Sequence, residues 1–235
     1  MEIFSQEFEV PQEGLSARRL FWMLQEVSGS HSRSIGYGED DMRALGVMWV
    51  VVRYGVTAER WPRAGERVRA ETWPGQTRHG MCPRFYRLRG ESGSVILSGS
   101  SLWAVVDRET RQMVVPHERG VDIEPQHVEG EAKLPATIRR PATDRETDFT
   151  VPEEYLDGNG HMNNTCYFDL AEQCTGLNAA RSGLREVQAE YLNEALLGER
   201  MRVLWGSDGD WYTVVGEADA GHVFRMRLRC AQENR

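Results

Sequence analysis

The stretch DGNGHMNN, residues 157–164, gathers residue types that can carry out acid–base chemistry. Asp157 is a candidate general base or nucleophile, and Asn159 and His161 are candidate hydrogen-bond donors to a reacting carbonyl oxygen. In an extended stretch these three side chains point the same way, and the intervening glycines allow a tight loop. A helical pattern follows directly. Its first amides are unpaired and partly positive, so they could hold an oxygen that gains negative charge.

Each of these residues also has an ordinary structural explanation. Asn163 or Asn164 could cap the following helix, and Asp157 in a glycine-rich turn could make an Asx turn. His161 alone is typical of a structural histidine. The whole set D-x-N-x-H-x-N-N directly before a helix is much less typical of an ordinary loop.

The chain repeats itself, which bears on its architecture. Three segments of the first half have counterparts in the same order in the second half: EFEVP (7–11) with DFTVP (148–152), LQEVSG (24–29) with LAEQCTG (170–176), and GERVRAETW (65–73) with GERMRVLW (198–205). Three collinear matches indicate two copies of one unit, fused in tandem.

The periodicity predicts the content of each unit. Ser16 is a plausible N-cap for a helix over 16–28, whose apolar residues recur every three or four positions. Tyr167, Leu170, Ala171 and Cys174 give a similar helical stripe in the second copy. Runs rich in Val, Trp, Tyr and Thr predict strands, at 47–59, 67–73, 84–90 and 94–107 in the first copy and at 184–192, 199–205, 211–218 and 222–231 in the second. The fold class is α+β, with a curved antiparallel sheet wrapped around one helix in each copy.

The two copies are separated by a proline-rich, charged segment with little periodicity, which predicts a surface linker. The expected organisation is an N-terminal unit over 1–120, a linker over 121–146 and a C-terminal unit over 147–235. Two such units can pack sheet edge to sheet edge and so remove exposed edges.

The second copy is longer at the entrance to its helix. Leu24 follows Pro11 by 13 positions, whereas Leu170 follows Pro152 by 18, and DGNGH lies within the longer stretch. A core-forming repeat does not need this insertion. The candidate site is therefore assigned to the C-terminal unit.

The composition excludes several classes of protein. The net charge of −8 argues against a general nucleic-acid binder. No apolar run approaches the roughly 18 residues of a membrane span, and the acidic N-terminal stretch does not look like an export signal, so a cytoplasmic protein is expected. The four cysteines are scattered, without metal-ligand spacing, so we expect no metal ion and no cofactor.

The motifs resemble those of the acyl-acyl-carrier-protein (acyl-ACP) thioesterases of plant plastids and bacteria, over nearly the whole chain. The family's D-x-N-x-H-x-N-N is matched by DGNGHMNN, and its Y-x-x-E on the next strand by Tyr191 and Glu194. Stretches 24–38, 46–74 and 100–116 of the first copy are also family-like. The resemblance implies a tandem "hotdog" fold with a non-catalytic N-terminal copy that binds the acyl chain.

The resemblance also implies an activity, namely hydrolysis of fatty acyl-ACP to free fatty acid and holo-ACP, which ends chain elongation. The implied catalytic residues are Asp157, Asn159, His161 and Glu194. Either carboxylate could activate a water molecule, or Asp157 could attack and form a mixed anhydride. Plant members carry a cysteine after the glutamate, where this chain has Ala195, so no cysteine nucleophile is expected. Glu172, on the following helix, is expected to be a surface or hydrogen-bonding residue.

Substrate-binding residues are assigned more loosely. The candidates are Asn163 and Asn164 in the loop and Leu20, Met23, Leu24 and Val27 on the first helix, although these four also read as ordinary core. The carrier protein is acidic, so an arginine patch should bind it, with 84–89 and Arg139, Arg140 and Arg145 as candidates. The sequence leaves the oligomeric state open, with a homodimer as one option.

Three other functions remain as alternatives. An acyl-CoA thioesterase of the hotdog superfamily has a similar motif, but such chains are single units that dimerise. A hydratase has one more residue within its motif. A non-catalytic acyl-binding regulator would not need Asp157, Asn159, His161 and Glu194 together.

Overall fold

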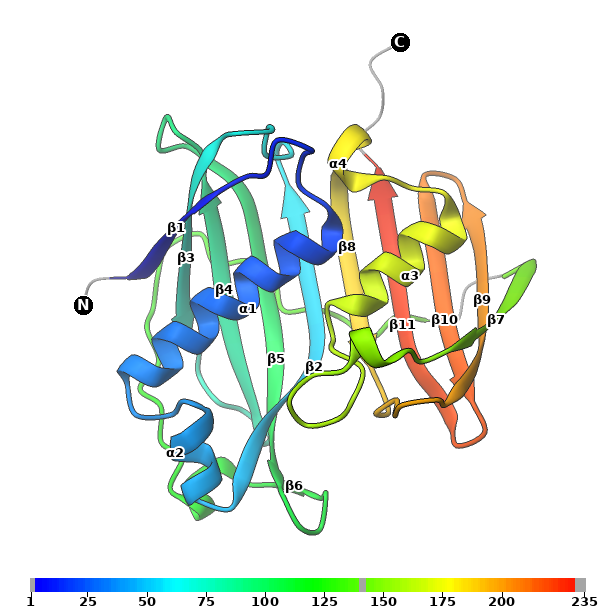
Figure 1. The fold of residues 1–235 in the computed structure, drawn as a ribbon. Coiled ribbons are helices and arrows are strands. Elements are labelled where there is room, and N and C mark those ends of the chain that lie inside the picture. The colour runs from blue at the N-terminus through cyan, green and yellow to red at the C-terminus, as the bar shows by residue number, and fades with distance from the viewer. Residues whose placement is uncertain (1–2, 140–142, 231–235) are drawn as a thin grey trace.

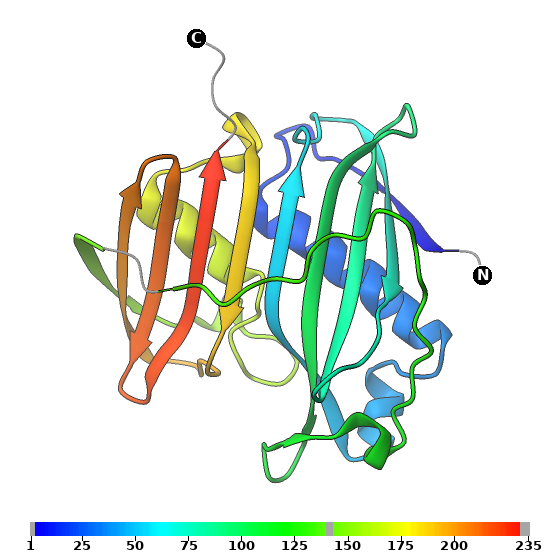
Figure 2. The same cartoon turned by 180° about the vertical axis from the view of Figure 1, so that it is seen from behind.

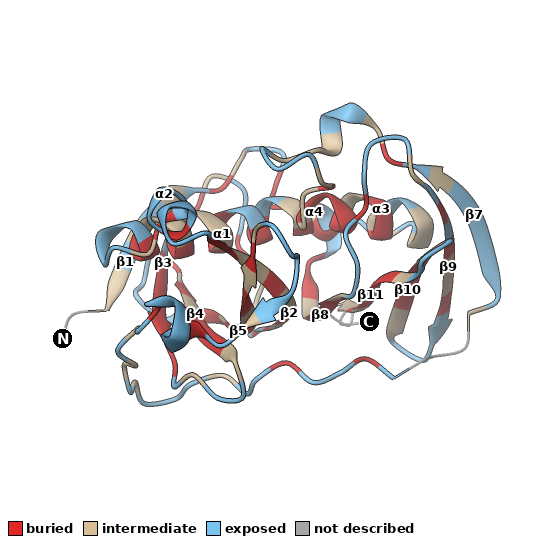
Figure 3. Cartoon of the chain, turned by 90° about the horizontal axis from the view of Figure 1, so that it is seen from below, coloured by how far each residue is buried: buried red, intermediate tan, exposed pale blue. Residues whose placement is uncertain are grey.

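The computed structural model describes residues 3–139 and 143–230. Its strands form one continuous antiparallel sheet in the order β1-β3-β4-β5-β2-β8-β11-β10-β9-β7, with β6 paired to β5. The helices α1 and α3 lie on the same face of this sheet (Figure 1). Seen from below, helices and sheet form two layers (Figure 3). This is the double hotdog architecture that the resemblance implies.

The N-terminal unit consists of one long helix, a short one, and six strands. Its elements are β1 (Phe4–Glu9), α1 (Ala17–Ser34), α2 (Glu39–Ala44), β2 (Val47–Ala58), β3 (Arg67–Pro74), β4 (Met81–Arg89), β5 (Val95–Asp107) and β6 (Met113–Val114), followed by the 3-10 turn η1 (Pro116–Arg119). The predicted N-cap is confirmed, because the Ser16 side chain accepts a hydrogen bond from the Arg19 amide.

The C-terminal unit repeats this plan with a shorter helix. Its elements are β7 (Arg145–Thr150), the 3-10 turn η2 (Glu153–Tyr155), α3 (Cys166–Thr175), α4 (Ala179–Ser182), β8 (Leu184–Tyr191), β9 (Arg200–Asp208), β10 (Trp211–Ala218) and β11 (Gly221–Cys230). The eight longer strands agree with the sequence predictions to within three residues at each end. The strands β1 and β7, at the start of each unit, overlap the repeated segments 7–11 and 148–152.

One hydrophobic core runs through both units. The Phe21 ring on α1 stacks on the Phe168 ring on α3, with centroids 3.9 Å apart. Beside them, Arg18 Nη1 and Asp169 Oδ2 form an ion pair at 2.6 Å. Burial of aromatic and aliphatic side chains is the main stabilising term in such a core. The two copies are therefore packed as a single body.

The seam between the units is the pairing of β2 with β8, which confirms the predicted edge-to-edge arrangement. At the seam Glu190, whose side chain is 1% exposed, lies between two arginines. Its Oε1 is 2.8 Å from Arg53 Nε, and its Oε2 is 3.6 Å from Arg225 Nη1. A buried carboxylate is tolerated only when it is paired in this way.

The linker crosses the sheet face opposite the helices (Figure 2). Ser100 Oγ donates a hydrogen bond to the Lys133 carbonyl, and Arg225 Nη1 donates one to the Ile138 carbonyl. Pro135 lies so close to Gly55 that a Cβ there would be 3.2 Å from the proline Cβ. The predicted surface linker is therefore a packed strap. Its predicted boundaries stay a prediction, and β7 begins two positions before the predicted start of the C-terminal unit.

Within the described part of the chain, no helix combines the length and the hydropathy that crossing a membrane would require.

Candidate active site

The loop 157–161 is folded by its own aspartate. Asp157 Oδ1 accepts hydrogen bonds from the amides of Asn159, at 2.8 Å, and His161, at 3.3 Å. The Asp157 amide in turn donates to the His161 carbonyl at 2.8 Å, and the Gly160 amide donates to the Asp157 carbonyl at 3.0 Å. Gly160 has φ of 79°, which favours glycine. The Asx turn considered above as the ordinary explanation is therefore present.

Backbone pairing brings the histidine to the distant glutamate. The Met162 amide donates to the Ala195 carbonyl at 2.8 Å, and His161 forms an isolated antiparallel bridge with Leu196. The loop is thereby aligned with the segment that follows β8, which carries Glu194. Ala195, where plant members have a cysteine, is fully buried and contributes its carbonyl to this pairing.

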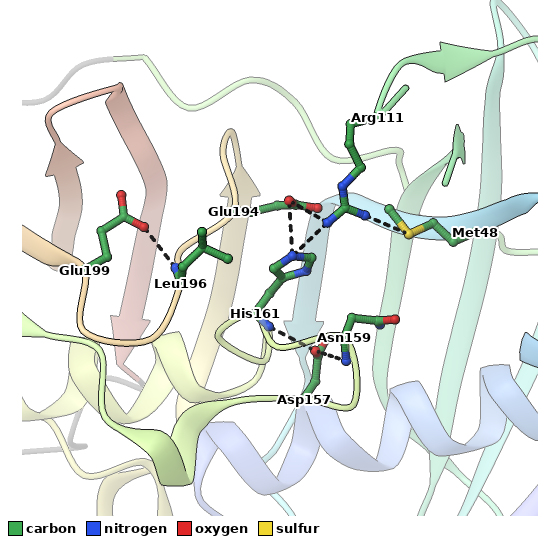
Figure 4. A network of polar contacts seen from close by, with 8 residues as sticks. All are labelled: Met48, Arg111, Asp157, Asn159, His161, Glu194, Leu196 and Glu199. Atoms are coloured by element: carbon green, nitrogen blue, oxygen red, sulfur yellow. Dashed lines mark hydrogen bonds and ion pairs between the residues drawn. The ribbon is translucent and has the colours of Figure 1, made fainter. Parts of the chain in front are cut away.

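His161, Glu194 and Arg111 meet at one point (Figure 4). His161 Nε2 lies 3.3 Å from Glu194 Oε2. Arg111 Nη2 lies 2.8 Å from the same imidazole nitrogen and donates to the same glutamate oxygen at 3.1 Å. The His161 side chain is 14% exposed, whereas Glu194 and Arg111 are 43% and 42% exposed. The cluster therefore lies at the surface end of a recess.

The contact with Arg111 indicates which nitrogen of the His161 ring carries the proton. A guanidinium only donates hydrogen bonds, so His161 Nε2 must accept and the ring proton is assigned to Nδ1. The imidazole nitrogen that faces Glu194 therefore carries a lone pair. Arg111 supplies the positive charge that lets this lone pair and a carboxylate oxygen lie side by side.

Arg111 was not predicted as a site residue. It belongs to the N-terminal unit, in the turn between β5 and β6, and has φ of 57°, unusual for a non-glycine residue. The Asp107 carboxylate fixes this turn by accepting the amides of Glu109 and Thr110 at 3.0 and 2.9 Å. The D-x-x-T spacing of Asp107 and Thr110 indicates such a turn. No pattern in the sequence indicates that this turn reaches the other unit.

A pocket of about 150 Å³ lies beside the cluster. Asp157, Asn159, His161 and Glu194 all line it. The other lining residues come from both units: Met48, Trp49, Val50, Val51, Met162, Asn164, Tyr167, Tyr191, Leu192 and Asn193. The four predicted catalytic residues thus share one recess, and among their side chains a direct contact is seen between His161 and Glu194. Figure 4 shows the Asn159 amide on the Met48 side of the loop.

Asn163 shapes the chain just before α3. Asn163 Oδ1 accepts hydrogen bonds from the Thr165 amide and hydroxyl at 2.9 and 2.7 Å, and its carbonyl accepts from the Cys166 amide. The N-cap of α3 is Thr165, without a side-chain cap hydrogen bond, so Asn163 forms an Asx turn and the capping role considered above is wrong. Asn164 lines the pocket, and its carbonyl accepts the Tyr191 hydroxyl at 2.8 Å.

The helix residues expected to bind an acyl chain lie in the core. Leu20, Met23, Leu24 and Val27 are at most 1% exposed, and none lines a pocket described here. An acyl-binding role for them stays a prediction. Glu172 accepts the Ala179 amide at 2.6 Å, as expected for a hydrogen-bonding residue, and burial raises its pKa.

The cysteines do not form a second nucleophilic site. Cys166 is buried on α3, and Cys174 is partly buried. Burial raises the pKa of both thiols, which disfavours the reactive thiolate. No group of His, Cys, Asp and Glu suited to a metal ion is found within residues 3–139 and 143–230.

The arginines of the stretch 84–89 are engaged within the molecule, and a docking role for this stretch stays a prediction. Arg84 is buried at 6% exposure, Arg87 lies over the Trp73 ring, and Arg89 pairs with Glu71. Arg139 and Arg145 are exposed and stay candidates. Arg140 lies outside the described residues.

Comparison with protein-family models matches both halves of the chain. Residues 2–119 match the acyl-ACP thioesterase N-terminal domain, and residues 138–226 match the acyl-ACP thioesterase C-terminal domain. The chain belongs to the acyl-ACP thioesterase family. The resemblance drawn from the motifs is confirmed.

Similar proteins are found among plant enzymes. A palmitoyl-acyl carrier protein thioesterase of Arabidopsis thaliana is 24% identical over 96% of this chain and 61% of its own length. A dodecanoyl-[acyl-carrier-protein] hydrolase of Cinnamomum camphora is 28% identical over 62% of this chain and 42% of its own length. Both names describe chloroplast proteins. The chain therefore spans 61% of the length of the Arabidopsis relative.

Solved structures share the fold. A 12:0-ACP thioesterase from Umbellularia californica has a TM-score of 0.80 at 23% identity, with 98% of each chain covered. An oleoyl thioesterase from Lactobacillus plantarum, given as putative in its own description, has a TM-score of 0.79 at 21% identity, with 99% of this chain and 98% of that chain covered.

Proposed function

We propose that this protein hydrolyses the thioester of acyl-ACP and releases a free acid and holo-ACP. The observation that carries the proposal is the contact of His161 with Glu194 inside a recess lined by Asp157 and Asn159, in a chain of this family. A hydrolase of this kind ends the elongation of the acyl chain. A cytoplasmic location stays a prediction, since the plant relatives are chloroplast proteins.

The geometry favours Glu194 and His161 as the pair that activates water. Asp157 Oδ1 is engaged by two loop amides, whereas the Glu194 carboxylate and the His161 Nε2 lone pair face one another at the exposed end of the recess. In this scheme water attacks the carbonyl carbon, its proton passes to Glu194 or His161, and the carbon–sulfur bond breaks. The pantetheine thiolate leaves and takes up a proton.

Two donors suit the developing oxyanion. The Arg111 guanidinium is 42% exposed at the mouth of the recess, and the Asn159 side chain lines the same space. A donor aimed at the carbonyl oxygen is worth about 10²–10³-fold in rate. Arg111 thus adds a charged residue of the N-terminal unit to polar side chains that otherwise come from the C-terminal unit.

The deciding experiment measures thiol release by the purified protein from acyl-ACP and from the matching acyl-CoA. We expect release from acyl-ACP, and its loss in His161→Ala. His117→Ala, an exposed histidine of the N-terminal unit, serves as the matched control. Faster release from acyl-CoA would identify acyl-CoA as the substrate in place of acyl-ACP. No release from either thioester would favour a non-catalytic acyl-binding protein.

The role of Asp157 is separated by two variants. Asp157→Asn keeps a side-chain oxygen for the loop amides, whereas Asp157→Ala removes it. If Asp157 only folds the loop, the Asn variant should keep most of the activity and the Ala variant should not. A mixed anhydride requires the carboxylate, and a single turnover in ¹⁸O-water would then place label in Asp157.

A further inference from the structure

A second pocket, of about 290 Å³, lies in the N-terminal unit under the C-terminal half of α1 and beside α2. Met48, Trp49 and Asn159 line both this pocket and the recess around His161. The two spaces therefore adjoin at these three residues. We refer to the larger of the two as the distal pocket.

The distal pocket contains a buried cation. Arg84, on β4, is 6% exposed and lines the pocket. Its guanidinium is bound only by neutral groups: Nη1 lies 2.9 Å from His31 Nδ1 and 3.4 Å from Thr72 Oγ1, and Nη2 lies 3.1 Å from Ser32 Oγ. Within the described residues, no carboxylate oxygen lies within 4.0 Å of Arg84.

The neighbouring histidine does not balance this charge. Burial and the adjacent Arg84 lower the pKa of His31 to about 4, so the ring is neutral near pH 7 and accepts the guanidinium hydrogen bond at Nδ1. Glu26 and Glu39 also line the pocket, together with Arg33 and Arg108. Neither carboxylate reaches Arg84, so its positive charge stays without a counterion.

An unpaired buried charge is costly. Burying an ion costs several kcal/mol that an opposite charge must offset, and burial accordingly lowers the pKa of Arg84. A guanidinium has five N–H donors, of which three are used by His31, Thr72 and Ser32. Two donors remain. A carboxylate can accept two N–H groups of one guanidinium at once, which is the strong form of this contact.

Part of the remaining wall is polar, while Met42, Trp49, Pro83 and Ile123 give it apolar surface as well. The Tyr86 hydroxyl is hydrogen-bonded to Ser28 Oγ at 3.0 Å and to Ser101 Oγ at 2.8 Å, and the Trp103 indole donates to the same Ser101 oxygen. Ser28 and Trp103 line the pocket with Arg84. A plain hydrocarbon end would leave the charge unpaired here, so this wall does not match a simple fatty acyl tail.

Only one end of the substrate can reach this position. The phosphate of a phosphopantetheine arm is tethered to its carrier protein and has to stay near the surface. Arg84 lies deeper, since it is only 6% exposed. Arg84 pairs across the sheet with Ser101, Ser101 with Tyr54, and Tyr54 with Ala189 on β8. Three strand spacings place it roughly 14 Å from β8. The free end of the acyl chain is the part that can extend so far.

We propose that the preferred substrate is an acyl thioester with a carboxylate at the far end of its chain, which Arg84 binds in the distal pocket. This inference rests on the proposed thioesterase function and specifies its substrate class. The product would be a dicarboxylic acid. Arg84 then discriminates such substrates from ordinary fatty acyl groups of the same length.

The test compares thiol release from two series of acyl-ACPs, alkanoyl and ω-carboxyalkanoyl, matched in chain length. The wild-type protein should have the higher kcat/KM for the ω-carboxy substrate at the length that reaches Arg84. Arg84→Met should lower that value by about 10–100-fold, the worth of a charge-assisted hydrogen bond, and should leave or raise activity toward the alkanoyl substrate. Arg202→Met, an exposed arginine on β9 that lines neither pocket, should leave the ratio unchanged.

A second readout does not need turnover. Calorimetry with monomethyl esters of dicarboxylic acids, which carry one carboxylate, should show binding to the wild-type protein and weak binding to Arg84→Met. Loss of all thiol release with this binding intact would refute the thioesterase and keep the anion site. A preference for alkanoyl-ACP at every length, or an unchanged ratio in folded Arg84→Met, would overturn the inference.

Discussion

The two units share a strand plan but differ around their helices. In the N-terminal unit α1 spans Ala17–Ser34, and its second half borders a polar pocket containing Arg84. In the C-terminal unit α3 is shorter, Cys166–Thr175, and the loop before it carries His161. The comparison shows that one scaffold can be specialised at opposite ends of its helix. One copy extends the helix toward a pocket, and the other replaces the helix entrance with the loop that carries His161.

The largest effect is expected at the catalytic loop. His161→Ala and Glu194→Gln should each lower kcat by about 10²–10⁴-fold, the usual contribution of a positioned acid or base. Steady-state thiol release from acyl-ACP measures this. Retained activity in both variants would show that the loop that distinguishes the C-terminal unit does not carry out the reaction.

The seam should be the most sensitive point for stability. Glu190→Ala leaves Arg53 and Arg225 without their buried partner, so we expect a loss of about 3–5 kcal/mol in the free energy of unfolding by urea. Glu186→Ala is the matched control on the same strand. It loses a partly exposed pair with Arg229 and should cost at most about 1 kcal/mol. A single unfolding transition is expected, because one core spans both units; two separate transitions would contradict this.

Arg111 tests whether the N-terminal unit takes part in the reaction. Arg111→Gly removes the guanidinium and also relieves the positive φ by about 1 kcal/mol, so a loss of activity cannot come from unfolding. We expect kcat to fall roughly 10²–10³-fold without loss of thermal stability. Gln112→Ala, in the same turn, should behave like the wild type. An unchanged kcat in Arg111→Gly would confine the chemistry to the C-terminal unit.

A further prediction concerns the pH dependence of stability. The pKa of His31 is about 4 in the folded protein against 6.5 ordinarily, so the unfolded chain binds the extra proton between these values. Stability from this group is complete above pH 6.5 and is lost as the pH falls toward 4, with a slope of at most about 1.4 kcal/mol per pH unit. His31→Asn should flatten the decline in urea titrations. Glu66 has a pKa of about 2, so it affects the pH dependence of stability only below pH 4.5. An identical slope in the wild-type protein and His31→Asn would contradict the assignment of the decline to His31.

Much of the fold follows from local pattern. The strands are long runs of β-branched and aromatic residues between turn residues, so their positions are encoded locally. The predicted first helix ended at residue 28, whereas α1 continues to Ser34. Its last turns, SGSHSRS, have no apolar stripe because they face the polar distal pocket. The short helices α2 and α4 were also not predicted.

The candidate site is only partly visible in the sequence. His161 and Glu194 are named by the resemblance, but their contact depends on backbone pairing between Met162 and Ala195, which no spacing reveals. Arg84 reads as one cation in a basic stretch, and only burial separates it from Arg87 and Arg89. Arg111 could not be assigned at all, because its target lies in the other copy.

The turn that carries Arg111 has a consequence for inheritance. In an assembly of two identical single-unit chains, one codon would alter this turn at both symmetry-related positions at once. After fusion, a substitution in the first copy changes only the guanidinium that faces His161. Each half of the gene can thus drift or be selected on its own account, while the common backbone keeps both halves in equal number.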